Sequence, residues 1–234
     1  MKVLGVIPAR GGSKGIPNKN IKLLNGKPLI YYSILEGLQS TVISDLIVST
    51  DDKEIKKIAE NFGANCPFIR PSDLSNDTAL AIPTIQHALF FMEKMKKFKY
   101  DYVVMLQPTS PLRTSTDIDK AIDMLIKSGS DGIISVVNVD NNHPMKMKKF
   151  LGKDQVSGKM VDYEKPPVEN CPRQKLPPVF IVNGAIYATK RNVLINDNSF
   201  QGQYCEGYVM SPERSINIDT IYDFYIAEKL MKGK

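Results

Sequence analysis

Apolar, strand-like segments alternate with helical patterns over residues 1–137 of the 234-residue chain, and this alternation constrains the fold more than any other feature. Buried strands are predicted at residues 3–8, 46–50, 66–69, 102–106 and 133–137, with helices at 28–39, 51–62, 77–97 and 115–127 between them. Strands joined through a helix lie parallel in one sheet, because the helix carries the chain back across its face. The sequence therefore predicts a doubly wound, mostly parallel α/β sheet, with ligands at the carboxyl ends of its strands.

The pattern changes between Asn138 and Pro178, where polar residues, glycine, lysine and proline dominate. We interpret residues 138–178 as a flap or small subdomain of short antiparallel strands, inserted into a single domain that spans residues 1–234. Strand character returns at residues 183–189. An amphipathic helix introduced by Asp219 is predicted to close the chain at residues 220–231.

Composition argues against several kinds of protein and site. Three well-separated cysteines argue against a disulfide framework and a zinc site, and two histidines argue against a multi-histidine metal site or a histidine base. A metal, if used, is expected to be a hard ion with oxygen ligands. No apolar run approaches the roughly 20 residues that span a bilayer. We therefore expect a cytoplasmic protein without a membrane partner.

The net charge of +6 suits an acidic partner, either nucleic acid or a small phosphate compound. No aromatic-rich RNA-binding signature accompanies the basic runs. The loop of residues 8–20, which follows the first strand, instead combines glycines with three cations and a hydroxyl donor: Arg10, Lys14, Lys19 and Ser13. Polyphosphate binding needs this combination, although the loop matches neither the P-loop nor the GxGxxG pattern. The alternative is a basic surface loop without a ligand.

The string IPARGGSKGIPNKN at residues 7–20 resembles the signature loop of the acylneuraminate cytidylyltransferases, the CMP-sialic acid synthetases. Four further segments agree in order and spacing: residues 49–51, 70–71 followed by 77–78, 107–113 (QPTSPLR), and 172–174 followed by 183–187. The resemblance covers nearly the whole chain and implies a Rossmann-like nucleotidyltransferase fold. It also implies that CTP and a nonulosonic acid give a CMP-sugar and pyrophosphate. N-acetylneuraminate is the first expected substrate, and legionaminic acid or another ketosugar acid is the alternative. A different kind of function, that of a noncatalytic nucleotide- or RNA-binding module, is also kept as an alternative.

The resemblance also implies roles for individual residues. The implied catalytic residues are Arg10, Lys19 and Asp219. The nucleotide site comprises Arg10, Ser13, Lys14, Lys19, Asn20 and Arg70. The sugar site comprises Gln107, Thr109, Ser110, Lys146, Arg173 and Asn183. The inserted flap, which carries Lys146 and Arg173, is expected to form a homodimer and to reach the partner's site, and no nucleic-acid partner is expected.

Residues 215–219 (SINID) resemble a family motif of two alternating aspartates that hold Mg²⁺, with Asn217 in the first aspartate's place. Alternation on a strand would point Asn217 and Asp219 to the same side. An amide oxygen can still be a Mg²⁺ ligand, so Asp219 is expected to be the main ligand and Asn217 the second. Asp219 could instead serve as the N-cap of the last helix. Ile181 stands where some sialic acid enzymes have an arginine, so this position does not decide which sugar acid is the substrate.

Overall fold

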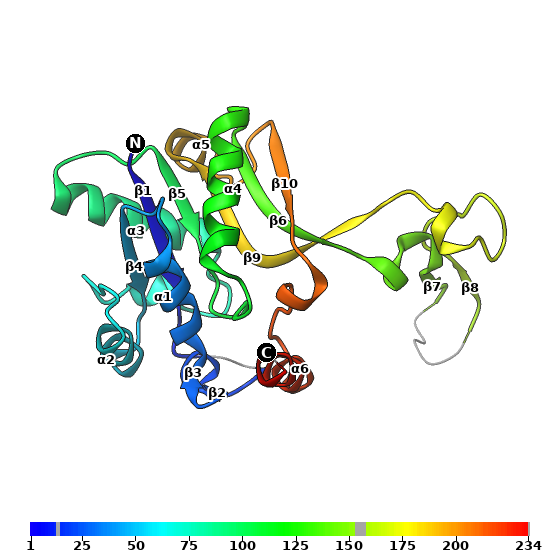
Figure 1. Ribbon diagram of the computed structural model, residues 1–234, viewed down its shortest axis with the longest axis horizontal. Coiled ribbons are helices and arrows are strands. Elements are labelled where there is room, and N and C mark those ends of the chain that lie inside the picture. The colour runs from blue at the N-terminus through cyan, green and yellow to red at the C-terminus, as the bar shows by residue number, and fades with distance from the viewer. Residues whose placement is uncertain (13–14, 153–157, 234) are drawn as a thin grey trace. The chain divides into compact units, whose positions relative to one another are not determined.

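A six-stranded sheet organises the computed structural model, which describes residues 1–12, 15–152 and 158–233 (Figure 1). Across the sheet, the strand order is β10 (Cys205–Val209), β6 (Gly132–Asn138), β9 (Phe180–Lys190), β5 (Tyr102–Met105), β1 (Val3–Pro8) and β4 (Asp45–Ser49). β1 pairs in parallel with β4 and β5, and β10 pairs in parallel with β6, whereas β9 is antiparallel to β5. The predicted mostly parallel α/β class is confirmed.

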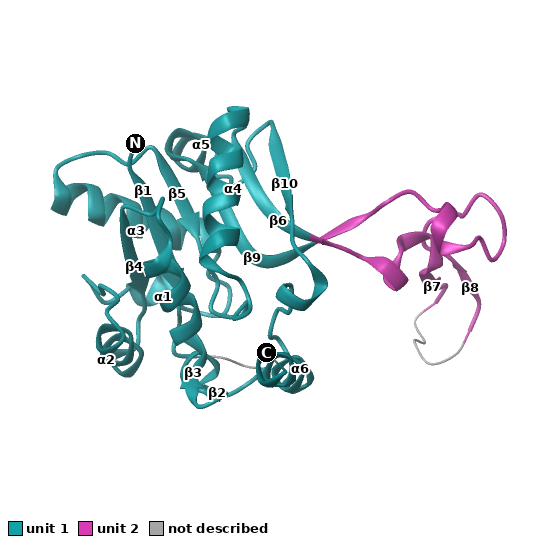
Figure 2. Ribbon diagram, in the orientation of Figure 1, with its two compact units in different colours: residues 1–136, 182–234 teal, residues 137–181 magenta. Residues whose placement is uncertain are grey.

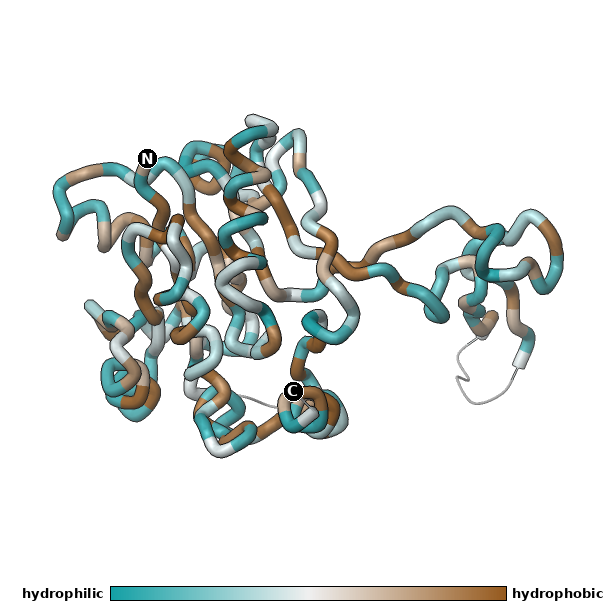
Figure 3. Tube along the Cα trace, viewed as in Figure 1, coloured by the Kyte–Doolittle hydropathy of each residue, from teal (hydrophilic) through white to brown (hydrophobic). Residues whose placement is uncertain are grey.

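Helices cover both faces of the sheet because successive side chains of a strand point to opposite sides. Val3 and Ile7 of β1 are buried in one core, whereas Leu4 and Val6 of the same strand are buried in a second. The first core includes residues of α1 (Leu29–Gln39), α2 (Lys53–Asn61) and α4 (Ser115–Ser128), and the second those of α3 (Ala81–Lys96) and α5 (Arg191–Asn196). The strands accordingly carry hydrophobic stretches, whereas the helices mix hydrophobic and hydrophilic residues (Figure 3).

A third, smaller core anchors the last helix beside the start of the chain. Phe224 and Ala227 of α6 (Ile221–Lys232) are buried in one cluster with Leu24, which lies in the short antiparallel pair β2 (Leu23–Leu24) and β3 (Lys27–Pro28). Ile16 of the first loop and Ile218, just before α6, belong to the same cluster. This packing holds the segment before α6 close to the first loop, although the two lie about 200 residues apart.

Local hydrogen bonds explain where the elements differ from the sequence-based predictions. The strand predicted at residues 66–69 is absent from the described structure, where a single bridge joins Asn65 to Ile47, and Pro67 has no N–H to donate to a ladder. α3 begins at Ala81 rather than at residue 77 or 78, because Asn76 accepts a hydrogen bond from the Thr78 N–H and fixes a turn there. The N-cap of α4 is Thr114, and the N-cap of α6 is Thr220 and not Asp219, which the sequence offered as the alternative role of that residue.

The described chain divides into two compact units, residues 1–136 with 182–234, and residues 137–181 (Figure 2). The second unit contains the antiparallel pair β7 (Lys148–Phe150) and β8 (Met160–Asp162). His143 is buried there, and its ring nitrogens engage the Pro177 carbonyl and the Met145 N–H. Short 3₁₀ helices complete the fold at Lys19–Ile21, Ser72–Leu74, Asp140–Asn142, Pro144–Lys146, Arg173–Lys175 and Pro212–Arg214. Among the described residues, no helix is both long and apolar enough to cross a membrane.

Candidate active site

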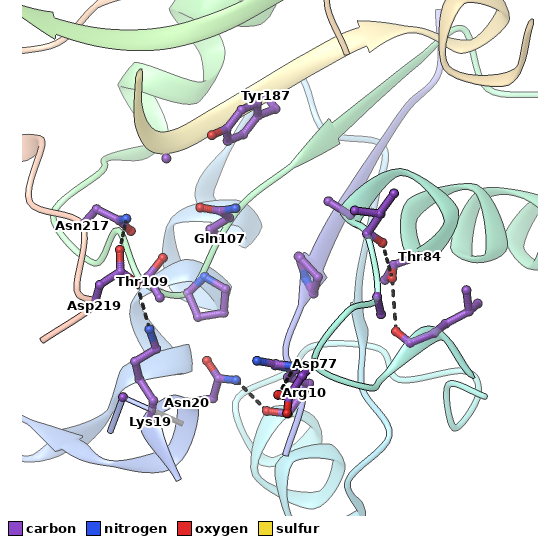
Figure 4. Close-up of a pocket in the computed structure, with 18 of the residues that line it drawn as sticks. Arg10, Lys19, Asn20, Asp77, Thr84, Gln107, Thr109, Tyr187, Asn217 and Asp219 are labelled. Carbon is purple, nitrogen blue, oxygen red and sulfur yellow. Dashed lines mark hydrogen bonds and ion pairs between the residues drawn. The ribbon is translucent and has the colours of Figure 1, made fainter. Parts of the chain in front are cut away.

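A cavity of about 740 Å³ lies in the first unit, where β1 ends at Pro8 and the segment after β5 begins (Figure 4). Eight residues predicted for the site line it: Arg10, Lys19, Asn20, Arg70, Gln107, Thr109, Asn217 and Asp219. Ser110 and Asn183 are buried outside the lining. Lys146 and Arg173 belong to the second unit, and Ser13 and Lys14 lie outside the described residues.

Arg10 is held at the cavity by the turn that precedes α3. Its guanidinium contacts the Asp77 carboxylate at 3.0 Å and donates a hydrogen bond to the Asn76 carbonyl at 3.0 Å. The Arg10 carbonyl in turn accepts a hydrogen bond from the Asn20 amide at 2.9 Å. The two side chains are 35% and 46% exposed, so an anionic ligand can compete with Asp77 for Arg10 at little cost in desolvation. Asp77 belongs to the family motif but was not predicted as a site residue.

Arg70 combines a place in the cavity wall with a structural ion pair. The residue is only 5% exposed, and its guanidinium lies 3.6 Å from the Asp51 carboxylate. It also donates hydrogen bonds to the Ser75 hydroxyl and the Ser49 carbonyl. Burial lowers the pKa of Arg70, and the neighbouring Arg10 lowers it further, against the opposing effect of Asp51. Arg70 therefore forms a structural ion pair and still faces the cavity.

Lys19 joins the first loop to the segment before α6. Its ammonium donates to the Ile218 carbonyl at 2.8 Å and contacts the Asp219 carboxylate at 3.2 Å. A Cβ on Gly15 would lie 2.9 Å from the Asp219 carbonyl, so this close approach of two backbones requires glycine. Residues that are 200 positions apart thus form one charged cluster (Figure 4).

Asp219 does not cap α6. Thr220 is the N-cap and accepts from the Asp223 N–H, while the Asp223 side chain accepts from the backbone N–H groups of Asp219 and Thr220. The Asp219 carboxylate is therefore left for Lys19 and for the Asn217 amide, which donates to it at 2.8 Å. Residues 215–218 form no strand, so the strand alternation that was expected to align Asn217 and Asp219 is absent, and this hydrogen bond joins the two side chains instead.

The Asn217 amide oxygen is buried and has no hydrogen-bond partner within the described part of the chain. A buried acceptor without a partner is costly unless a ligand supplies one. Beside the Asp219 carboxylate it makes a pair of oxygen donors of the kind that Mg²⁺ takes together with phosphate oxygens and water. The described residues contain no group of three acidic, histidine or cysteine side chains able to hold an ion alone. The residues present therefore fit a metal ion that a polyanionic substrate shares.

Gln107 and Thr109 line the cavity from the loop after β5, and Tyr187 faces them from β9 (Figure 4). Burial raises the pKa of the Tyr187 phenol, so it is a neutral hydrogen-bonding group at pH 7. Gly184 of the same strand has φ +77°, and a Cβ there would lie 2.9 Å from the Gln107 amide oxygen. Tyr187 was missed as a site residue, although it ends the Asn-Gly-Ala-Ile-Tyr string.

Ser110 and Asn183 are placed differently from the prediction that they contact the sugar. Ser110 is fully buried, and its hydroxyl is directed to the Asn183 carbonyl. The Asn183 side chain is 4% exposed and bridges the Ser135 and Ser215 hydroxyls at 2.6 and 2.9 Å. Direct contact with a ligand does not fit this burial. Position in the sequence indicates that these residues lie near the ends of strands, but it does not show whether a side chain points into the cavity or into the core.

Comparison with known proteins agrees with this geometry. A family model described as cytidylyltransferase matches residues 4–196. The chain is 37% identical to CMP-N,N'-diacetyllegionaminic acid synthase of Legionella pneumophila, over 99% of this chain and 97% of that protein. It is 32% identical to N-acylneuraminate cytidylyltransferase of Escherichia coli, over 100% of this chain and 53% of that protein.

The fold is similar to a solved CMP:2-keto-3-deoxy-manno-octonic acid synthetase complexed with CTP, with a TM-score of 0.70 at 19% identity over 100% of this chain and 99% of that one. The likeness to that structure concerns the fold. Because the family model matches most of the chain, and because relatives above 30% identity align over nearly all of it, the protein belongs to the cytidylyltransferase family and is a nucleotidyltransferase.

Proposed function

We propose that the protein transfers CMP from CTP to a nonulosonic acid and releases pyrophosphate. The observation that carries this proposal is the convergence of Arg10, Lys19 and Asp219 on one cavity, from opposite ends of the chain. Two cations and a carboxylate around a cavity at the carboxyl ends of the parallel strands β1 and β5 suit a triphosphate and its metal ion.

In the proposed reaction, the anomeric hydroxyl oxygen of the sugar acid attacks the α-phosphorus of CTP. The new P–O bond forms as the bond to the β-phosphate oxygen breaks, and the hydroxyl proton is released. The electron pair, and with it negative charge, passes to the departing pyrophosphate. Arg10 and Lys19 neutralise this charge when they exchange Asp77 and Asp219 for phosphate oxygens. Arg10 is suited to this task because its planar guanidinium can hold two oxygens at once.

The pair Asn217 and Asp219 would hold a Mg²⁺ ion shared with the triphosphate. When bound, the ion supplies charge neutralisation to the phosphate oxygens. Release of Lys19 from Asp219 frees the carboxylate and the ammonium together, so triphosphate binding prepares both groups. Asn20 orients the backbone of Arg10, and Arg70 stands on the nucleoside side of the cavity, where we place the cytosine and ribose.

The sugar acid would contact Gln107, Thr109 and Tyr187. An amide and two hydroxyls suit a polyhydroxylated substrate that bears N-acyl groups. N-acetylneuraminate is the substrate that the sequence motifs favour. N,N'-diacetyllegionaminic acid is the second candidate, because the relative that carries its name is the more similar of the two compared.

The second unit would complete the site across a homodimer. Lys146 and Arg173 lie there, and the Arg173 side chain, which is about half exposed, contacts Asn141 at 3.1 Å and Asp140 at 3.6 Å. We propose that a partner subunit's unit supplies both cations to the sugar carboxylate. The cytoplasmic location, and the lack of a nucleic-acid or membrane partner, stay predictions.

Pyrophosphate release tests the proposal. The protein is mixed with CTP, Mg²⁺ and one of several nonulosonic acids, N-acetylneuraminate and N,N'-diacetyllegionaminic acid among them, with ATP and UTP as controls. We expect release with CTP and one sugar acid. If CTP binds but no sugar acid gives release, a noncatalytic nucleotide-binding module is the better description.

A further inference from the structure

Arg113 is a buried arginine that the proposed reaction does not use. It ends the QPTSPLR string and lies immediately before the N-cap of α4. The residue is 1% exposed, and among the described residues no carboxylate lies within 4 Å of its guanidinium. Burial lowers the pKa of Arg113 to about 10, partly offset by the charges of Glu36 and Asp117, so the side chain remains a cation at pH 7.

The guanidinium of Arg113 instead contacts three neutral acceptors on three parts of the fold. It donates to the Ala185 carbonyl of β9 at 2.7 Å, to the Ser33 hydroxyl of α1 at 2.7 Å and to the Gln107 carbonyl at 3.4 Å. The Ser33 hydroxyl donates to the same Gln107 carbonyl at 3.2 Å. The Arg113 Nε–H has no partner in the described structure.

Burying a cation without an ion-pair partner is expensive, so a role in stability alone is a poor reason to retain it. A guanidinium offers something that an apolar side chain or an ammonium does not. Its five donors lie in one rigid plane and reach acceptors in different directions. Here that plane fixes the distance between the loop after β5 and strand β9.

Those two backbones carry the side chains that we place at the sugar. Gln107 and Thr109 follow β5, while Gly184 and Tyr187 flank the Ala185 carbonyl on β9. Gln107 packs so closely on Gly184 that a Cβ there would lie 2.9 Å from its amide oxygen. The nucleotide side has contacts of its own, since Arg10 engages Asp77 and Lys19 engages Asp219. A hydrogen bond from the Ile218 N–H to the Thr109 carbonyl at 2.8 Å joins this side to the loop after β5.

We infer that Arg113 is a positioning residue for the sugar acid: it sets the spacing of the two walls that contact this substrate and leaves the CTP side unaffected. The inference rests on the proposed function and extends it to a residue outside the cavity. It predicts a selective effect on one of two substrates, which general loss of stability does not produce.

The test uses Arg113→Lys, which keeps the charge but loses the planar guanidinium, and Arg113→Met, which loses both the charge and the guanidinium. Ser33→Ala removes one acceptor of Arg113 and one donor to Gln107 with a smaller change in volume. Arg191→Lys is the matched control, because Arg191 pairs with Glu93 between α5 and α3, and neither residue lines the cavity. KM for CTP and for the sugar acid are measured by pyrophosphate release, with the folded fraction from circular dichroism.

We expect both Arg113 variants to raise KM for the sugar acid at least about tenfold while KM for CTP stays within about twofold, since small misplacements of binding groups are costly. Ser33→Ala should move the same constant in the same direction, and Arg191→Lys should move neither. Equal changes in both constants, no change, or full activity of Arg113→Lys would overturn the inference. If both Arg113 variants fail to fold, Ser33→Ala decides by the same criterion.

The wild-type protein separates this inference from the proposed function. Turnover of a sugar acid by the wild type, without a selective effect in the variants, rejects the role of Arg113 alone. Absence of turnover by the wild type with every sugar acid rejects the proposed function and this inference together.

Discussion

Replacing Asn217 with aspartate tests the proposed metal site most directly. In the structure the Asn217 amide donates to the Asp219 carboxylate at 2.8 Å. Asn217→Asp replaces that donor with a second anion at the same place. Without metal the two carboxylates repel each other, and with Mg²⁺ they both become ligands. The variant is therefore expected to bind Mg²⁺ more tightly and to be less stable without it.

The magnitude follows from the geometry. Two unit charges about 4 Å apart interact by about 1 kcal/mol in water and about 4 kcal/mol at an effective dielectric constant near 20. The Asp219 side chain is 67% exposed and Lys19 lies 3.2 Å away, so the lower part of this range applies. A repulsion of about 1.4 kcal/mol corresponds to a factor of about ten in an equilibrium constant.

The assay is the Mg²⁺ concentration that gives half-maximal pyrophosphate release at saturating CTP. We expect this concentration to fall about tenfold in Asn217→Asp, and thermal stability in the presence of EDTA to fall as well. Asn198→Asp is the control, because it adds the same charge at a residue that does not line the cavity and keeps the acceptor that Gln86 uses. An unchanged midpoint, with unchanged stability in EDTA, would remove Asn217 from the metal site.

Three further predictions concern stabilisation of the leaving group, stability of the fold at acidic pH, and the dimer. Arg10→Ala should lower kcat/KM roughly 100-fold or more, as loss of one charge-stabilising donor typically does, and near wild-type turnover of the folded variant would refute the role. Burial raises the pKa of Asp117, but hydrogen bonds from Thr114 and Arg214 outweigh this and lower it. The stability that Asp117 contributes is therefore present above its unfolded pKa, which is near 4, and it is lost as pH falls through the lower folded pKa. In thermal melts between pH 6 and pH 2, the wild type should therefore lose more stability than Asp117→Asn. If Arg173 serves the partner's site, mixing inactive Arg10→Ala and Arg173→Ala subunits should restore about one quarter of wild-type activity after exchange, and no recovery in exchanged heterodimers would contradict that arrangement.

The sequence by itself determined the class of fold and predicted the chemistry of the first loop. Alternating strand and helix patterns identify a parallel sheet because each period reflects which faces are buried. The cations and glycines at residues 10–20 indicate polyphosphate, since this is a property of residue types at close spacing. The family resemblance is what implies Asn217 and Asp219 as oxygen ligands of a metal ion. Eight of the residues that the first loop and the family resemblance predict for the site line one cavity in the structure.

Only the tertiary structure decided which side chains face that cavity and which partners they keep. Asn183 and Ser110 turn away from it, whereas Tyr187 and Asp77 face it, because orientation depends on packing between segments far apart in the chain. Thr220 rather than Asp219 caps α6, since the reciprocal bonds with Asp223 outcompete it. Arg113 acquires its three acceptors from α1, the loop after β5 and β9, which no local pattern brings together.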